Sequence, residues 1–441
     1  MPRRFIICQK DLYYFIGQFF LNFVTKLSTS RLLVAVFLFY GLLAMSPIWG
    51  HIGWRGVLTA ALAVFLTFPA VLAADSKARL PSLLFIFLLL VSAFATAIYW
   101  GDIRFFFGPI FLITAVWLLQ FGDKRTLERF VDAATLLLGI ALVGAIIGFV
   151  LALRGIEPIW VIQNPDGRPN WLFLTTFSNH RSLGFIRPSG FFDEPGAFSF
   201  VICVIAGLRH LLKKNSKTTW LLLIGGLVTF SLAHLIYMFF HLVAQRIDAR
   251  NFLSFVGLFA AVVIVAIATG FSDLFVDRLF WRLTLSESGT LAGDNRSWRL
   301  LNAYYFLAEN PSALFFGADP SCRFDYETCK SMFPLMGENP LAPIVHFGLM
   351  QSWPYILVLA VLLLSPLYGR HNLVLFGIAL LLLQRPYILA IGYSFLTWLC
   401  LVIFVAGVRQ RRRSSSNERV RSLEGAVRTW SQQSAQRTLK T

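Results

Sequence analysis

Long apolar segments dominate this chain and decide what it can fold into. Several of them hold about 17 or more apolar residues, the length that an α-helix needs to cross the hydrocarbon core of a bilayer. Of the 441 residues, 57% are hydrophobic and only 14% are charged, whereas a soluble domain is charged at about a quarter of its positions. A backbone exposed to lipid must satisfy its own hydrogen bonds, and helices do so. The sequence therefore predicts an all-α polytopic membrane protein.

The hydropathy pattern predicts about 12 transmembrane helices in one bundle over residues 32–408. The apolar spans lie at 32–49, 55–73, 82–99, 104–121, 132–152, 195–212, 219–231, 232–245, 252–270, 341–366, 372–384 and 387–407. Residues 1–31 form a basic, amphipathic segment before the bundle, and residues 409–441 form a basic tail. Two long polar connections, 153–194 and 271–340, predict two large loops on the same side of the membrane.

The basic residues predict the orientation of the chain in the membrane. The formal net charge is +17, which is also seen in nucleic-acid-binding proteins. Here most of the 39 Lys and Arg residues lie in the termini and in short loops of one side, and the two large loops are close to neutral. The positive-inside rule then places both termini in the cytoplasm and both large loops in the periplasm. We expect a multi-pass protein of the bacterial inner (plasma) membrane, with no nucleic-acid partner.

The segments on either side of the predicted bundle are basic, and one pair of spans within it is short. The first segment is typical of a helix that lies in the membrane interface, or of one that binds a partner. The basic tail is expected to be disordered, with its first residues on anionic lipid. Residues 219–245 can be read as one long helix or as two short passes. Two passes are favoured because they keep the basic tail in the cytoplasm.

Both large loops lead into the next span through an acidic or amide pair followed by proline. These entries are Asp193-Glu194-Pro195 and Glu338-Asn339-Pro340. Proline is tolerated in a first helical turn, and Asp193 and Asn339 are good N-cap residues. The two helix N-termini would face the periplasm, where their N–H groups favour anions. Glu338 and Glu194 are therefore candidate catalytic residues, although helix capping alone is the simpler explanation of such pairs.

Several arginines lie in the predicted periplasmic loops, where the positive-inside rule disfavours basic residues. A guanidinium binds phosphate oxygens in pairs and keeps its charge, so periplasmic arginines are candidates for holding a pyrophosphate without a metal. The candidates, with Asn339, are Arg181, Arg187, Arg278, Arg282, Arg296, Arg299 and, at the turn between the last two spans, Arg385. Salt bridges to the acidic residues of the second loop are the alternative explanation for them.

The second loop carries two further features. Residues 294–308 predict a helix with Arg296 and Arg299 on one face. Cys322 and Cys329 are close in sequence and would lie on the oxidising side, so we expect a disulfide between them. No Walker A motif, dinucleotide fingerprint or HExxH motif is present, and the histidines are isolated. We therefore expect no metal and no cofactor.

Four stretches taken in order resemble a known superfamily. They are RPSGFFDEPGAFSF at 187–200, TFSLAHLIY at 229–237, DNRSWRLLNAYYFLAENPSALFFGAD at 294–319 and ENPLAPIVHFGLMQSWPYIL at 338–357. Together they resemble the O-antigen polymerase and O-antigen ligase superfamily (Wzy-type polysaccharide polymerases), over roughly residues 130–400. The family often carries a histidine where this chain has Glu338, and a serine–arginine boundary where it has Ser231-Leu232. These departures leave open which residue is the base, and whether the chain is a polymerase or a ligase.

The resemblance implies a membrane glycosyltransferase that polymerises polyprenyl-pyrophosphate-linked oligosaccharide repeat units at the periplasmic face. A carboxylate, Glu338 or Glu194, would deprotonate the acceptor hydroxyl, and arginines would stabilise the leaving pyrophosphate. The partners would be the lipid-linked donor and acceptor, membrane lipids, a chain-length regulator and a flippase. Two alternatives remain: a ligase that transfers glycan to lipid A core or protein, and a transporter of lipid-linked sugars, which predicts charges deep inside spans.

Overall fold

The computed structural model describes residues 29–48, 80–121, 123–163, 169–182, 185–245, 257, 296–320, 339–386 and 392–410. Over these ranges the protein is mostly helical (78%), with 12 α-helices. They are α2 (Thr29–Gly41), α5 (Leu80–Trp100), α6 (Phe107–Phe121), α7 (Lys124–Leu153), α8 (Pro195–Leu211), α9 (Ser216–Gly225), α10 (Leu232–Ala244), α13 (Arg296–Glu309), α14 (Pro311–Phe316), α16 (Ala342–Leu364), α17 (Leu373–Gln384) and a last helix, Gly392–Gln410. Short 3-10 turns join several of them, including Gly226–Thr229 and Arg370–Asn372.

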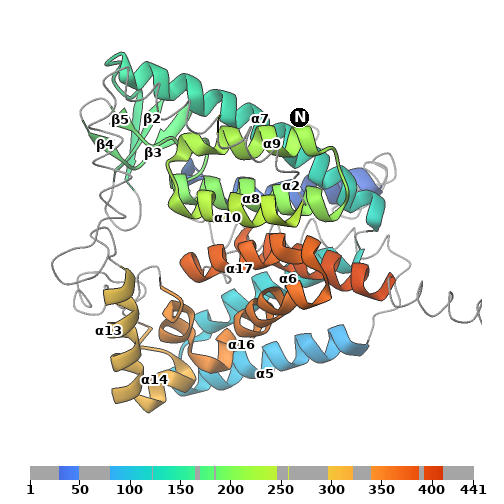
Figure 1. Cartoon of the computed structure of the whole chain (residues 1–441). Helices are drawn as coiled ribbons and strands as arrows, with labels where there is room; N and C mark the ends of the chain where they lie inside the picture. Colours follow the sequence, from blue (N-terminus) through green and yellow to red (C-terminus); the bar gives the residue numbers. More distant parts are fainter. Residues whose placement is uncertain are drawn as a thin grey trace, which may run out of the picture.

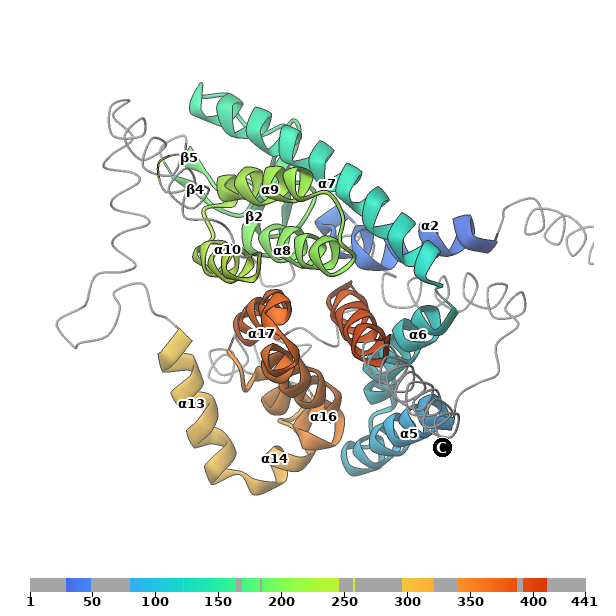
Figure 2. The ribbon, with the colours of Figure 1, turned by 45° about the vertical axis from the view of Figure 1, so that its right-hand side comes forward.

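The helices form two packed groups that share one apolar core (Figures 1 and 2). One group holds α2 and α7 to α10, and the other holds α5, α6, α16, α17 and the last helix. The contact between α10 and α17 joins the groups. In the core, the rings of Phe37, Phe130 and Phe395 meet edge to face, with centroids 5.0 to 5.8 Å apart. Three helices from distant parts of the chain are therefore packed at one aromatic cluster.

In the part of the chain that the structure describes, three helices are long and apolar enough to cross a membrane: Lys124–Leu153, Ala342–Tyr368 and Gly392–Gln410. Six further apolar helices have 10–17 residues. On α7 an outward-facing stripe is exposed, with Leu136 at 66%, Ile140 at 62% and Val143 at 58%. Apolar residues exposed in a continuous stripe of this kind suit contact with lipid. A membrane location thus fits these helices. The predicted spans at 55–73 and 252–270 lie almost entirely outside the described residues, so the count of about 12 stays a prediction.

Residues 219–245 form two helices. α9 and α10 are separated at Phe230, which adopts a left-handed conformation (φ 49°). Trp220, near the start of α9, donates from Nε1 to Oε1 of Gln245 just after α10, at 2.9 Å, so the two helices run in opposite directions. The buried His234 of α10 links the two helices, because its Nε2 lies 2.7 Å from the carbonyl oxygen of Leu223 in α9. The prediction of two helices is confirmed, and one continuous helix is wrong.

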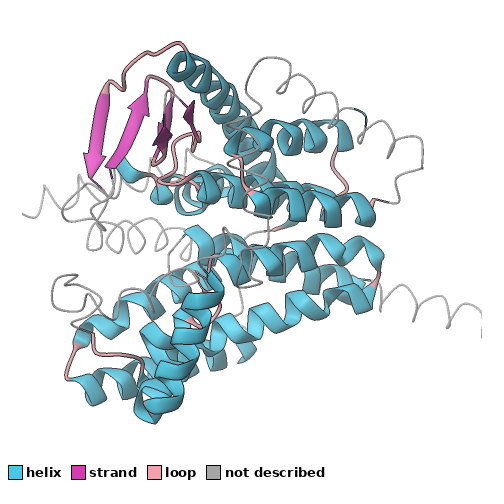
Figure 3. Ribbon diagram, turned by 60° about the vertical axis from the view of Figure 1, so that its left-hand side comes forward, coloured by secondary structure: helices cyan, strands magenta, loops and turns pink. Residues whose placement is uncertain are grey.

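The first large loop contains strands, so the all-α prediction is wrong for this segment (Figure 3). Three short strands pair in the antiparallel order β1 (Trp160–Gln163), β2 (Pro169–Phe173) and β3 (Thr176–Ser178). A second ribbon pairs β4 (Arg181–Ser182) with β5 (Phe185–Ile186). Phe173 and Ile186 are buried against the C-terminal part of α7. We call this end of the bundle the strand end.

The described part of the second large loop contains the predicted helix. α13 spans Arg296–Glu309 against the predicted 294–308, and α14 follows it. Both pack on α16, which is interrupted at Gly348 by a left-handed conformation (φ 63°). The backbone of Phe315 and Phe316 fills the space that a side chain at Gly348 would need. A glycine is required here for two reasons, its φ angle and the close approach of another backbone.

We predict that Gly348→Ala lowers the free energy of unfolding by at least about 2 kcal/mol, because the new Cβ meets backbone atoms and the φ angle is unfavourable for alanine. Thermal unfolding of the purified protein in detergent measures this. The matched control is Gly139→Ala in α7, where nothing lies within 4 Å of the added carbon. That change should stabilise by up to about 1 kcal/mol. Equal effects of the two substitutions would contradict the assignment.

Candidate functional site

Two predicted site residues, Glu194 and Arg385, form a buried ion pair at the strand end. Glu194 is the N-cap residue of α8, and Arg385 follows the last residue of α17. Their side chains are only 12% and 9% exposed, and an Nη2 hydrogen bond joins the guanidinium to the carboxylate. The start of α8 meets the end of α17 because these packed helices run in opposite directions. The fold therefore brings together two charges that are 191 residues apart in the sequence.

Two neighbouring residues shape the surroundings of this pair. Gly196 lies in the first turn of α8, and an added Cβ there would meet the guanidinium of Arg385. Tyr393, at the start of the last helix, forms a side-chain hydrogen bond with Arg385 and lies close to the charges of Asp193 and Glu194. The guanidinium is thus enclosed by the first turn of α8 and by a phenol from the last helix. Sequence patterns gave no signal for Tyr393, because it belongs to no charged motif, whereas Gly196 directly follows the Asp193-Glu194-Pro195 entry.

The capping prediction for the first entry is wrong. The N-cap position is Glu194 and not Asp193, and the Glu194 side chain forms no capping hydrogen bond. Its carboxylate turns to Arg385, while its backbone carbonyl accepts from the N–H groups of Ala197 and Phe198. The backbone carbonyl of Asp193 accepts from Nδ2 of Asn170 on β2, at 3.0 Å. The sheet therefore holds the chain entering α8, and this leaves the Glu194 carboxylate to its ion pair.

Arg187 has a structural role at the break between α9 and α10. Its Nε donates to the carbonyl of Thr229 at 3.3 Å, and its Nη2 to that of Phe230 at 3.1 Å. The left-handed turn at Phe230 removes these two carbonyls from the helical pattern, so they need other donors. Arg187 was predicted to bind a pyrophosphate. Part of its guanidinium is bound to these backbone oxygens, and the pyrophosphate role stays a prediction.

Arg181 forms an ion pair within the first loop. Its Nη2 lies 2.5 Å from Oε1 of Glu157, and the Glu157 side chain is 70% exposed. The hydrogen bond from Arg181 lowers the pKa of Glu157 below its ordinary value, and the guanidinium charge acts in the same direction. The alternative explanation of the arginines invoked acids of the second loop, but this partner belongs to the first. An exposed pair of this kind contributes little to stability.

The other predicted site residues are only partly described. Asn339 is buried, and its Oδ1 accepts from the N–H of Leu341 at 2.9 Å in the turn before α16. The N-cap position of α16 is Leu341, so the prediction of Asn339 as the N-cap is wrong. Arg299 is partly exposed on α13. Glu338, Arg278, Arg282, Cys322, Cys329 and the side chain of Arg296 lie outside the described residues. The candidate role of Glu338 as the base and the predicted disulfide therefore stay predictions.

The two loop regions lie at the same end of the bundle but on different flanks. The strands lie beside α7, and α13 and α14 lie beside α16 (Figures 1 and 2). Among the described residues, no three His, Cys, Asp or Glu side chains are grouped so that they could hold a metal ion. The chemistry available at the strand end is therefore a carboxylate, a guanidinium and a phenol beside a helix N-terminus.

The comparisons with known proteins add no identity to this geometry. No family model, curated protein or solved structure matches the chain. The resemblance seen in the short motifs consequently stays a prediction, and the function has to be argued from the site.

We predict that Glu194→Gln destabilises the protein by about 3–5 kcal/mol, because it leaves the Arg385 charge buried without a partner. The double variant Glu194→Gln/Arg385→Met should recover much of this loss, since it removes both charges. Thermal unfolding of the four members of this cycle measures the coupling.

The matched control for that cycle is Glu157→Gln. It breaks an ion pair of the same residue types, but an exposed one, and should cause no measurable loss of stability. Full stability of Glu194→Gln alone would show that the buried pair does not hold this end of the bundle.

Proposed function

We propose that this chain is a membrane glycosyltransferase that polymerises polyprenyl-pyrophosphate-linked oligosaccharide repeat units at the periplasmic face of a bacterial inner membrane. The observation that carries the proposal is the buried Glu194–Arg385 pair at the N-terminus of α8. A base for the acceptor hydroxyl and a cation for the leaving group are the two charges this reaction needs. Both are found in contact, at the end of the bundle that carries the two loops (Figure 1).

In the proposed reaction the acceptor hydroxyl oxygen bonds to the anomeric carbon of the donor, and the bond from that carbon to the pyrophosphate oxygen breaks. The proton of the hydroxyl passes to the Glu194 carboxylate, and the configuration at the anomeric carbon inverts. Arg385 and the positive end of the α8 dipole stabilise the charge that develops on the pyrophosphate. Once the guanidinium contacts the pyrophosphate, it holds the carboxylate less tightly, and Glu194 becomes a better base.

The location of the buried charges supports surface chemistry over transport. The buried charged residues of the described part of the chain are Glu194, Arg209 and Arg385. Each lies within two residues of a helix end, whereas a transporter is expected to carry charges deep inside its spans. The lipid tails of the substrate would lie against exposed apolar surface such as that of α7. By the resemblance, Glu338 is a second candidate for the base.

The test uses a host that lacks its own polymerase and makes lipid-linked repeat units. Wild type should restore a ladder of long glycan chains, and Glu194→Gln should lose it by a factor of about 100 or more, the loss expected for a general base. Because Glu194→Gln is also expected to be unstable, the double variant Glu194→Gln/Arg385→Met is the sharper probe. It should accumulate to normal levels and still make no long chains.

Three outcomes separate the candidate functions. Normal ladders from both the double variant and Glu338→Gln, at normal protein levels, would overturn the assignment. Glu157→Gln is the control and should behave as wild type, since its pair is exposed. An assay of purified protein supplied with lipid-linked repeat units distinguishes a polymerase from a ligase and from a transporter. A polymerase lengthens the glycan, a ligase moves it to another acceptor, and a transporter makes no new product.

A further inference from the structure

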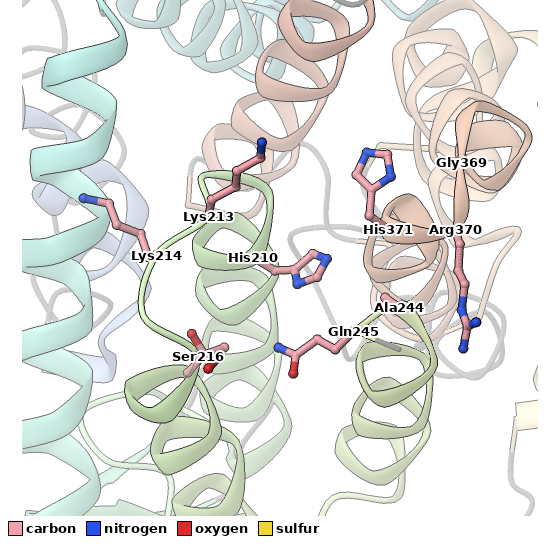
Figure 4. A pocket seen from close by; sticks show the side chains of 10 residues that line it. His210, Lys213, Lys214, Ser216, Ala244, Gln245, Gly369, Arg370 and His371 are labelled. Carbon is pink, nitrogen blue, oxygen red and sulfur yellow. The ribbon is translucent and has the colours of Figure 1, made fainter. Parts of the chain in front are cut away.

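A second charged site lies at the end of the bundle opposite the Glu194–Arg385 pair. A cavity of about 660 Å³ opens where α8 and α10 end and where α9 and α17 begin (Figure 4). We call it the His210 pocket. Its lining residues are His210, Lys213, Lys214, Ser216, Thr219, Ala244, Gln245, Gly369, Arg370 and His371. The volume is in the range of pockets that hold small ligands, about 300–1,000 Å³.

The charged side chains that line the pocket are all basic. Three side chains are cations, two are histidines, and none of the lining residues is Asp or Glu. The charge of Lys214 is paired with an acidic residue outside the pocket, because its Nζ lies 2.8 Å from Oδ2 of Asp132. Arg370 is held in place by its Nε, which donates to the Val243 carbonyl at 2.7 Å. Arg370 and Lys213 thus contribute cationic side chains to the lining from two different elements, the turn before α17 and the turn after α8.

Lys213 occupies a position that normally holds glycine. Its N–H bonds to the carbonyl of His210, and the N–H of Lys214 bonds to that of Arg209, which together form a Schellman motif after α8. The residue at this place is left-handed, and Lys213 has φ 55°. Glycine adopts such an angle without the penalty that a side chain incurs. The chain therefore carries a cation at the edge of the pocket at a cost in conformational energy, and such strain is typical of functional sites.

Other groups around the cavity can donate hydrogen bonds to an oxyanion. His210 and His371 face the cavity from opposite sides, and Gln245 projects into it from the end of α10 (Figure 4). Ser216 opens α9, whose N-terminus favours negative charge. Imidazole, hydroxyl and amide groups next to guanidinium and ammonium groups make up a set suited to phosphate oxygens.

We propose that the His210 pocket binds a phosphate-bearing anion. The same chemistry is offered by the headgroup of an anionic phospholipid and by a soluble diphosphate. The inference is independent of the proposed function, because the pocket and the Glu194–Arg385 pair lie at opposite ends of α8.

The experiment uses the purified full chain and two probes. Inorganic pyrophosphate is added in non-ionic detergent at constant ionic strength, and its binding is followed by the rise in Tm. Phosphatidylglycerol is supplied in nanodiscs of phosphatidylcholine, and the lipid bound to the protein is counted by native mass spectrometry. The variants are Lys213→Gly and Lys213→Gln. The control is Lys217→Gln, which removes an exposed cation four positions further on that does not line the pocket.

We expect wild type and the control to bind at least one probe, and both Lys213 variants to bind it about tenfold more weakly. Dependence of pyrophosphate binding on Lys213 identifies a soluble ligand, and dependence of phosphatidylglycerol binding identifies a headgroup. Lys213→Gly should also raise the Tm of the ligand-free protein, because it relieves the left-handed strain. This combination of higher stability and weaker binding is not expected of a purely structural lysine. Wild type that binds neither probe, or Lys213 variants that bind as tightly as wild type, would overturn the proposal.

Discussion

The ion pair between Glu194 and Arg385 is the interaction on which the strand end of the bundle depends. Two charges taken out of water lose hydration, and their attraction offsets this loss only when the geometry is held. Here α8, α17 and the last helix hold it, since Gly196 leaves room for the guanidinium and Tyr393 covers it. The sheet fixes the entry to α8 through Asn170. The charged centre and the packing around it therefore require each other.

At the opposite end of the bundle another buried arginine, Arg209, is also held by polar partners. Arg209 is buried and binds Thr135 on α7, Thr219 on α9 and the carbonyl of Asn215. Charge thus appears where α7, α8 and α9 come together at a helix end, and apolar residues fill the middle of the bundle. This distribution suits a membrane, where a charge near an interface costs less than one at the centre. It also leaves each end with polar groups that can meet a charged ligand.

The sequence predicted the helices well because apolar length and helical periodicity are local properties. The α13 helix was readable in this way, whereas the break in residues 219–245 was favoured by the distribution of charge along the chain. The strands of the first loop were missed because each is five residues or shorter, and β2, β3 and β5 pack on α7, which lies outside the loop. Glu194 and Arg385 were selected for separate reasons, and nothing local indicated that residues 191 apart would pair. The contact of Arg187 with the carbonyls of Thr229 and Phe230 had no signal in the sequence, because a turn between two other helices exposes those oxygens.

The pairing of Glu194 with Arg385 also restricts how the proposed chemistry can proceed. A carboxylate held by a guanidinium is a weak base, so the ligand-free arrangement is a resting one. An acceptor sugar alone would find Glu194 engaged, whereas a pyrophosphate offers Arg385 another anion and releases the carboxylate. The donor would then prepare the base for the acceptor. Arg385→Lys tests this order, because a lysine keeps the charge but cannot bind carboxylate and pyrophosphate with the same fork of N–H groups. Glycan transfer by this variant should fall while the protein stays folded.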